Sequence, residues 1–341
     1  MAARRGDTLL FPTPPVVAAH AAIGGKKEGE GPLAACFDEL SADNFFGQSN
    51  WEAAEKEMAL RAAQLCLKKA ETTPDKVSLA LAGDLQAQCT ASSYALRELG
   101  IPFAGLFGAC STMAEALGLG AALCSAGMAD GLLAMTSSHF CAAERQFRTP
   151  LSYGAVRTPT AQWTATAAGA CLLRPAGEGV QLCAATFGRV QDYKIKDINN
   201  MGAAMAPAAA ATLLRYLKDT GSAPADFDRI YTGDLGHVGS QLLRDLLAAE
   251  GLLLKNHVDC GCILYDAAEQ TVKSGGSGPG CCASVLCGHI LPRLEKGTQK
   301  RVLFIATGAL MSQTTFLQKE SIPAIAHLVE LRSPQQKEEN E

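Results

Sequence analysis

The sequence is short of charged residues. Only 19% of its 341 residues are Asp, Glu, Lys or Arg, whereas 48% are hydrophobic, and this balance leaves little scope for long disordered segments. An excess of basic residues is also absent, since the formal net charge is −4. Proteins that bind nucleic acids concentrate Lys and Arg on one face, so we expect no nucleic-acid partner.

Long hydrophobic runs without charge are missing as well. The most apolar long stretch, residues 113–135, contains Glu115 and Asp130, whereas a membrane-spanning helix needs about 20 consecutive apolar residues. The N-terminal segment carries Asp7 and several prolines in place of the apolar region of a signal peptide. We therefore expect neither secretion nor a transmembrane segment of the chain's own.

Cysteine is abundant, but metal-ligand spacing is lacking. The 13 cysteines are odd in number and scattered, which indicates free thiols in a reducing compartment rather than a disulfide framework. The pairs Cys260/Cys262 and Cys281/Cys282 have no second pair or histidine at the spacing of a zinc site, so we expect no metal. Residues 275–280, GGSGPG, lack the Lys-Ser/Thr of a phosphate loop, and their glycines indicate close backbone approach instead.

What the chain does contain is a long internal repeat. Residues 79–100 and 230–251 both read as an apolar strand, a Gly-Asp-Leu turn and an amphipathic helix. Solenoid repeats are roughly 20–50 residues long, so this wide spacing favours a duplicated half-domain around one large core. A duplicated α/β half with a cysteine at a strand-to-helix turn is typical of few folds, and the thiolase-like fold is one of them.

The repeat divides the chain into two halves. We predict an N-terminal half over residues 1–175, a C-terminal half over 176–332 and a disordered tail over 333–341. The best-marked helix begins after Ser49 or Asn50, because either residue can cap it. Residues 138–163 fit neither a helical nor a strand period, and we interpret them as an irregular insertion of the kind that is usually functional.

Cys110 stands where a helix begins. The helix dipole and the unpaired N–H groups at such a position lower the pKa of a thiol, which favours a nucleophile or a contact for an anion. Packing alone explains a cysteine there equally well. The repeat adds that Cys110 and Ser111 in the first half should face the same pocket as Gly276 and Gly278 of the glycine-rich loop in the second.

Charged side chains gather in the insertion. Glu144, Arg145, Arg148 and Arg157 offer one carboxylate and several guanidinium groups, which match carboxylates through paired hydrogen bonds. The cluster therefore suits an organic anion. His139 directly follows a strand end, a common place for a pocket residue. For each arginine the alternative is a solvated or ion-paired side chain, and for His139 it is a surface or hydrogen-bonded ring.

The most specific motif is SSHFCAAERQFR, which lies within GACSTMAEALGLGAALCSAGMADGLLAMTSSHFCAAERQFRTPLSYG and is followed by RTPTAQWTATAAGA. This combination strongly resembles the stage V sporulation protein AD family of endospore-forming bacteria, and the match runs from WEAAEKEM to GSGPGCCASVLCG. The family is similar in fold to thiolases and ketoacyl synthases. The resemblance thus implies an α/β, thiolase-like, duplicated five-layered αβαβα fold with two pseudo-symmetric halves.

The resemblance also implies a function. It points to a protein of the developing spore that binds dipicolinic acid, alone or as its calcium chelate, for uptake during sporulation and release in germination. Its partners would be dipicolinate and the membrane channel proteins of the same sporulation operon. We expect peripheral association with the cytoplasmic side of the forespore or spore inner membrane, no cofactor beyond calcium carried with dipicolinate, and a homodimer.

The second half departs from the catalytic relatives. Condensing enzymes usually have a His after the repeated strand and an Asn or His in the glycine loop, which act as base and oxyanion donor. Here these places hold Asp234, with His237 one turn on, and Gly276 or Ser277. A carboxylate beside a thiol raises the pKa of that thiol. We therefore predict a former active site that serves for binding.

The predicted ligand contacts can now be stated. They are Cys110, Ser111, His139, Glu144, Arg145, Arg148, Arg157, Asp234, Gly276 and Gly278. Binding should weaken in Arg145→Ala or Arg148→Ala and survive Cys110→Ser. Two alternatives stay open: an acyltransferase with Cys110 as nucleophile and His139 or His237 as base, and a structural assembly subunit.

Overall fold

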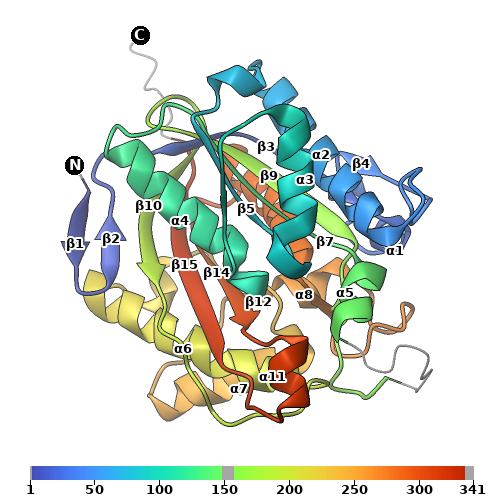
Figure 1. The fold of residues 1–341 in the computed structure, drawn as a ribbon. Coiled ribbons are helices and arrows are strands. Elements are labelled where there is room, and N and C mark those ends of the chain that lie inside the picture. The colour runs from blue at the N-terminus through green and yellow to red at the C-terminus, as the bar shows by residue number, and fades with distance from the viewer. Residues whose placement is uncertain (1, 148–156, 335–341) are drawn as a thin grey trace.

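A computed structural model describes residues 2–147 and 157–334 of the chain (Figure 1). Arg148 and residues 335–341 of the predicted tail lie outside the described residues. The short elements are β1 (Ala3–Arg5), β2 (Thr8–Leu10), α1 (Lys26–Gly29), β4 (Glu39–Leu40), β8 (Trp163–Thr164), α8 (Cys260–Leu264), β13 (Gly276–Ser277), α10 (Leu291–Glu295) and α11 (Gln313–Leu317).

The first half contributes one side of a large mixed sheet. Its strands are β3 (Val16–Gly24), β5 (Leu79–Gly83), β6 (Phe103–Gly105), β7 (Leu132–Ser138) and β9 (Ala167–Arg174). They lie in the order β3-β9-β7-β5-β6. β5 pairs in parallel with β6 and β7, whereas β9 runs antiparallel to both β3 and β7.

The second half repeats this arrangement. Its strands are β10 (Val180–Phe187), β11 (Arg229–Thr232), β12 (His257–Asp259), β14 (Arg301–Ala309) and β15 (Ala324–Arg332). They lie in the order β10-β15-β14-β11-β12, with β11 parallel to its neighbours and β15 antiparallel to both of its own. The two halves join where β10 pairs with β3. The shared order confirms the predicted duplication.

Helices cover and separate the two groups of strands. On the outer face of the first half lie α2 (Trp51–Lys69) and α3 (Thr90–Leu99), and on that of the second half lie α6 (Met201–Thr220) and α7 (Gly236–Ala249). Between the halves lie α4 (Thr112–Ser125) and α9 (Pro279–Val285), whose residues fill the central core. Figure 1 shows α4 crossing in front of β15. The result is the predicted αβαβα layering.

Small residues let α4 lie between two sheets. A Cβ atom at Gly118 would come within 3.1 Å of the Ala185 side chain on β10, and one at Gly120 within 2.7 Å of Leu132 and Leu173 on the first half's strands. Because the helix contacts strands on both sides, bulkier residues would force the layers apart. The Ala- and Gly-rich composition of this segment therefore follows from its central place.

Two sequence-based boundaries need correction. The predicted irregular insertion over 138–163 contains a helix, α5 (Phe140–Phe147). Ala142 and Ala143 pack inward there, and the residues at 144–146 are good helix formers. The N-terminal segment does not belong spatially to the first half, since β2 pairs with β10. The division at 175/176 falls in the turn between β9 and β10 and stays a prediction.

Within the described ranges, no helix is long and apolar enough to cross a membrane.

Candidate functional site

Cys110 lies at the junction of the two halves. It belongs to a turn of 3-10 helix, Ala109–Ser111, directly before α4, and it is 7% exposed. The turn packs on the end of β14, where a Cβ atom at Gly308 would come within 2.2 Å of the Gly108 carbonyl oxygen. Ser111 is fully buried and donates its Oγ hydrogen to the same carbonyl at 2.7 Å. The site therefore requires glycine in the facing strand.

Asp234 lies beside this thiol. It follows β11, is fully buried, and accepts hydrogen bonds at 2.9 Å from both Ser277 Oγ and the Gly278 N–H. Its other oxygen accepts a hydrogen bond from Thr307 Oγ1 at 2.8 Å. The Cys110 thiol is a further hydrogen-bonding partner of the carboxyl group. Asp234 thus joins the glycine loop, β14 and the turn that carries Cys110.

These surroundings keep the thiol neutral. Burial raises the pKa of Cys110 well above its usual range, and the charge of Asp234 and the hydrogen bond to it raise it further. A hydrogen bond from the Gly278 N–H favours the thiolate, but it lowers the pKa by less than burial and Asp234 raise it. Burial also raises the pKa of Asp234. The structure therefore places the Asp234 carboxyl group beside Cys110, where it raises the pKa of the thiol as the sequence predicted.

Gln162 holds the glycine loop against the site. Its Nε2 donates to the Asp234 carbonyl oxygen at 2.6 Å and to the Gly276 carbonyl oxygen at 2.9 Å. The loop backbone continues as β13, which pairs in parallel with β8. At Gly278 the backbone φ is +100°, and a Cβ atom there would lie 2.7 Å from Ser138 Oγ. Both observations account for the glycine.

Neither predicted histidine reaches the thiol. His139 is 1% exposed, and its Nδ1 accepts a hydrogen bond from the Cys141 N–H at 3.2 Å, which leaves Nε2 to donate to the Asn44 carbonyl oxygen at 2.8 Å. Burial lowers the pKa of His139, so its ring is neutral. The side chain of His237 is exposed at the start of α7. Among the described residues, no histidine hydrogen-bonds Cys110.

Arg145 makes its contacts with α2. From α5 its guanidinium group pairs with Glu52 on α2 at 3.1 Å and lies 4.7 Å from the centre of the Trp51 ring. Nearly half of its side chain is exposed. In this arrangement Arg145 connects two helices at the surface of the first half.

Arg157, in contrast, lies next to the site. It forms an ion pair with Glu144 at 3.1 Å and donates to the carbonyl oxygen of Gln162, the residue that holds the glycine loop. Its guanidinium carbon lies 5.5 and 5.4 Å from the ring centres of Phe140 and Trp163, which stack at 3.7 Å. Among the described residues, the buried Nε of Arg157 has no hydrogen-bond partner, and neither has the buried Oε1 of Gln162.

Some site residues were not found from the sequence. Thr307 and Gln162 both touch Asp234. Thr307 stands in no recognisable motif, and Gln162 lies within the quoted RTPTAQWTATAAGA segment but was not singled out there. A weak signal exists for Thr307, because it is a polar residue at the carboxyl end of an otherwise apolar strand. Within residues 2–147 and 157–334, no cluster of three or more His, Cys, Asp or Glu side chains is placed to hold a metal ion.

Comparison with known proteins gives a family. The family described as Stage V sporulation protein AD matches residues 5–332. One curated relative, the Stage V sporulation protein AD of Bacillus subtilis (strain 168), is 42% identical over 322 residues, which are 94% of this chain and 95% of the relative.

Solved structures of similar fold are condensing enzymes. Cerulenin-bound OleA of Xanthomonas campestris has a TM-score of 0.62 at 15% identity, and 97% of this chain and 99% of that chain are covered. For 3-oxoacyl-[acyl-carrier-protein] synthase III of Aquifex aeolicus VF5, the TM-score is 0.55 at 13% identity, with 93% and 99% covered. At such low identity these likenesses show the fold, which is thiolase-like.

Proposed function

Because the chain belongs to the stage V sporulation protein AD family, and is thus a sporulation protein with a thiolase-like fold, we propose that it binds dipicolinic acid or its calcium chelate without catalysing a reaction. In this role it serves uptake of the ligand into the developing spore and its release in germination. Calcium enters with the ligand in this proposal and is not a resident cofactor.

The neutral thiol supports the noncatalytic part of the proposal. A cysteine nucleophile reacts as the thiolate, which a neighbouring cation or histidine normally stabilises. Transfer of the Cys110 proton to Asp234 would leave a buried thiolate beside the glycine loop with only the Gly278 N–H to favour it. Burying an ion without a paired charge is costly. The arrangement therefore favours a protonated thiol that takes part in packing and ligand contact.

The observation that carries the ligand proposal is the pair of unpartnered polar atoms beside the glycine loop. Arg157 Nε and Gln162 Oε1 are both buried, and neither has a hydrogen-bond partner within residues 2–147 and 157–334. A buried polar atom left unpaired costs about 1–3 kcal/mol, so a ligand that pairs with it gains affinity. Dipicolinate offers carboxylates to a guanidinium group and a planar ring to the nearby aromatic pair.

The same proposal includes partners and location. We propose that the protein associates peripherally with the cytoplasmic side of the forespore or spore inner membrane, where it meets channel proteins of its operon. A homodimer formed along β6 would fit the fold, because β6 ends the path of strands in the first half. Phe107, which follows β6, is 67% exposed and would be covered by such a contact.

An acyltransferase is the second candidate, favoured by the fold shared with condensing enzymes. It would use Cys110 as nucleophile and His139 or His237 as base. Intact-mass measurement after incubation with acyl-CoA tests it: a covalent adduct that disappears in Cys110→Ser would contradict the noncatalytic proposal, and no adduct is expected. Calorimetric titration with dipicolinate tests the binding itself.

A further inference from the structure

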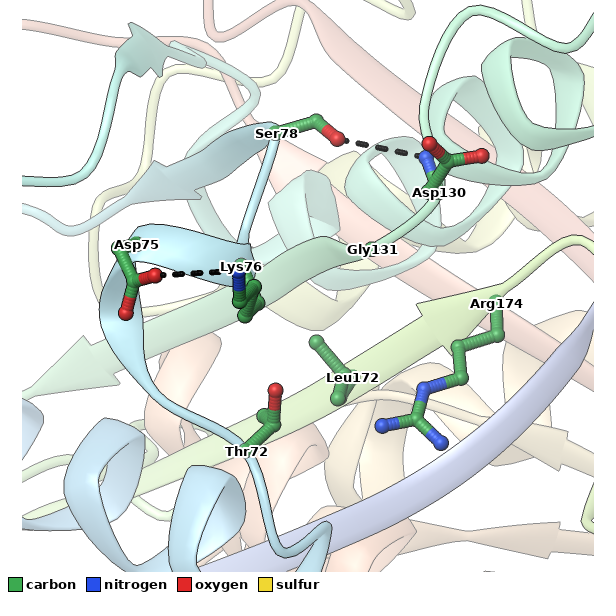
Figure 2. Close-up of a pocket in the computed structure, with 8 residues that line it drawn as sticks. All are labelled: Thr72, Asp75, Lys76, Ser78, Asp130, Gly131, Leu172 and Arg174. Carbon is green, nitrogen blue, oxygen red and sulfur yellow. Dashed lines mark hydrogen bonds and ion pairs between the residues drawn. The ribbon is translucent and has the colours of Figure 1, made fainter.

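A cavity lies at the ends of the strands that are opposite to the Cys110 turn. It has a volume of about 430 Å³ and opens between the start of β5, the start of β7 and the end of β9. Figure 2 shows Arg174 reaching into it from β9, across the cavity from Asp75 and Lys76. The lining residues are Thr72, Asp75, Lys76, Ser78, Asp130, Gly131, Leu172 and Arg174.

Because the fold is duplicated, this cavity can be compared with the equivalent region of the second half. Leu132 of β7 pairs with Leu173 of β9, and in the second half Val302 of β14 pairs with Leu331 of β15. Because the strand orders are the same, these registers align the two halves residue by residue. The equivalent positions are Gly131 and Arg301, Leu172 and Glu330, Arg174 and Arg332, and Ser78 and Asp228.

In the second half, side chains fill the corresponding space. Glu330 accepts hydrogen bonds at 2.7 Å from Nε of Arg301 and from Nε of Arg332, and another from the hydroxyl of Tyr216. The guanidinium carbon of Arg301 also lies 4.4 Å from the centre of the Phe227 ring. These bonds hold the pKa of Glu330 below its usual range despite its burial. A buried carboxylate is thus the centre of this cluster.

The first half has the same backbone arrangement around this space, but it has no carboxylate at the position of Glu330. Ser78 Oγ accepts a hydrogen bond from the Asp130 N–H, just as Asp228 accepts one from the Lys300 N–H. Gly131 and Leu172 remove the first guanidinium group and the carboxylate, and the cavity results. Arg174 remains, with one Nη2 bond to the Ala70 carbonyl oxygen at 3.3 Å and no ion pair among the described residues.

We propose that this cavity binds a small aliphatic carboxylate, whose charged group takes the place that the Glu330 side chain has in the second half. A guanidinium group with free N–H donors binds a carboxylate through paired hydrogen bonds. Lys76 adds positive charge, although Asp75 lies 3.5 Å from it. The carboxylates of Asp75 and Asp130 at the rim disfavour a polyanion, so a monocarboxylate should bind better than phosphate.

This site is independent of the proposed dipicolinate site, and its test uses a different probe. Propionate, which reproduces the Glu side chain, is titrated into the full chain while the Arg174 Nε–H signal is followed by NMR. We expect a saturable shift, binding at least about tenfold weaker in Arg174→Gln, and unchanged binding in Arg332→Gln. An unsaturable shift, equal binding in Arg174→Gln, or equal competition by inorganic phosphate would overturn the proposal.

A variant that refills the cavity provides a second test. Leu172→Glu places a carboxylate at the position equivalent to Glu330, within reach of Arg174 in the arrangement of the second half. It should abolish propionate binding while dipicolinate binding stays unchanged. If Leu172→Glu folds and still binds propionate as the original chain does, the carboxylate does not occupy the predicted place, and the proposal is wrong.

Discussion

Asp84 and Asp234 occupy the same position in the repeated Gly-Asp-Leu turn, but they bind different parts of the molecule. Asp84 accepts hydrogen bonds from the N–H and Oγ of Ser92, at 2.8 and 2.7 Å, and so stabilises the helix that follows it. Asp234 accepts its side-chain bonds from the glycine loop, β14 and the Cys110 thiol. One turn is local, whereas the other connects the two halves.

This difference predicts the effect of Asp234→Asn. The new amide group cannot accept all the hydrogen bonds that the carboxylate accepts, so at least one buried donor loses its partner, at a cost of about 1–3 kcal/mol in the free energy of unfolding. Loss of the negative charge should also lower the pKa of Cys110 toward its ordinary value. Iodoacetamide should then alkylate Cys110 faster, measured peptide by peptide with mass spectrometry.

Asp84→Asn is the matched control for that experiment. It removes a buried carboxylate from the equivalent turn, but its hydrogen bonds lie within the first half. Stability should fall while the alkylation rate of Cys110 stays as it was. Equal acceleration in both variants would indicate general loosening of the protein rather than a specific effect of Asp234.

Glu55→Gln should change how stability depends on pH. Glu55 is buried, its oxygens accept hydrogen bonds from Ser137 and Gln86, and burial together with the charge of Asp84 raises its pKa to about 8. The unfolded chain releases this proton near 4.5, so Glu55 contributes stability that is complete below that pH and is lost as the pH rises toward 8. The neutral amide of Gln has no such loss.

Urea unfolding at pH 5.5, 7 and 8.5 measures this effect. The original chain should lose more stability between pH 5.5 and 8.5 than Glu55→Gln does. Glu98→Gln, which alters an exposed residue of α3, should behave as the original chain. Parallel pH profiles for the original chain and Glu55→Gln would show that Glu55 does not hold its proton in the folded state.

Asn50→Ala should weaken the start of α2. The Asn50 side chain accepts a hydrogen bond from the Ala53 N–H at 2.9 Å, and loss of such a cap costs about 1 kcal/mol. Ser49→Ala is the matched control, because the sequence alone allowed either residue to be the cap and the structure assigns that role to Asn50. Thermal unfolding should separate the two variants, and equal losses of stability would contradict the assignment.

Gly308→Ala should disturb the junction that carries Cys110. The added methyl group would lie 2.2 Å from the Gly108 carbonyl oxygen, so the backbone of the turn must shift. Overpacking of this kind costs about 1–3 kcal/mol. Chemical unfolding should show the loss, and dipicolinate binding should weaken as well. An unchanged free energy of unfolding would mean that the turn can move without cost.

The sequence predicted what depends on local pattern and on the repeat. Apolar strands, the turns at Asp84 and Asp234 and the small-residue helices followed from the local sequence pattern, and their duplication placed Cys110 opposite the glycine loop. The helix over Phe140–Phe147 was not predicted, because it is short and only two of its residues are buried, which leaves little apolar periodicity to recognise.

The partners of individual charged residues could not be predicted. Arg145 and Arg157 lie in one short segment, yet Arg145 binds Glu52 of α2 and Arg157 binds Glu144 and the backbone of Gln162. Such choices depend on which distant element packs nearby, and sequence spacing does not encode that. The cavity at Arg174 could not be predicted either. It exists because the first half lacks two side chains that fill the equivalent space in the second half.

The most direct test of the account is calorimetric titration of the purified full chain with dipicolinate, with and without calcium. We predict saturable binding that is at least about tenfold weaker in Arg157→Gln and is retained in Cys110→Ser and Arg174→Gln. Absence of binding in both buffers, or the same affinity in Arg157→Gln as in the original chain, would contradict a carboxylate-binding site beside Cys110 and Asp234.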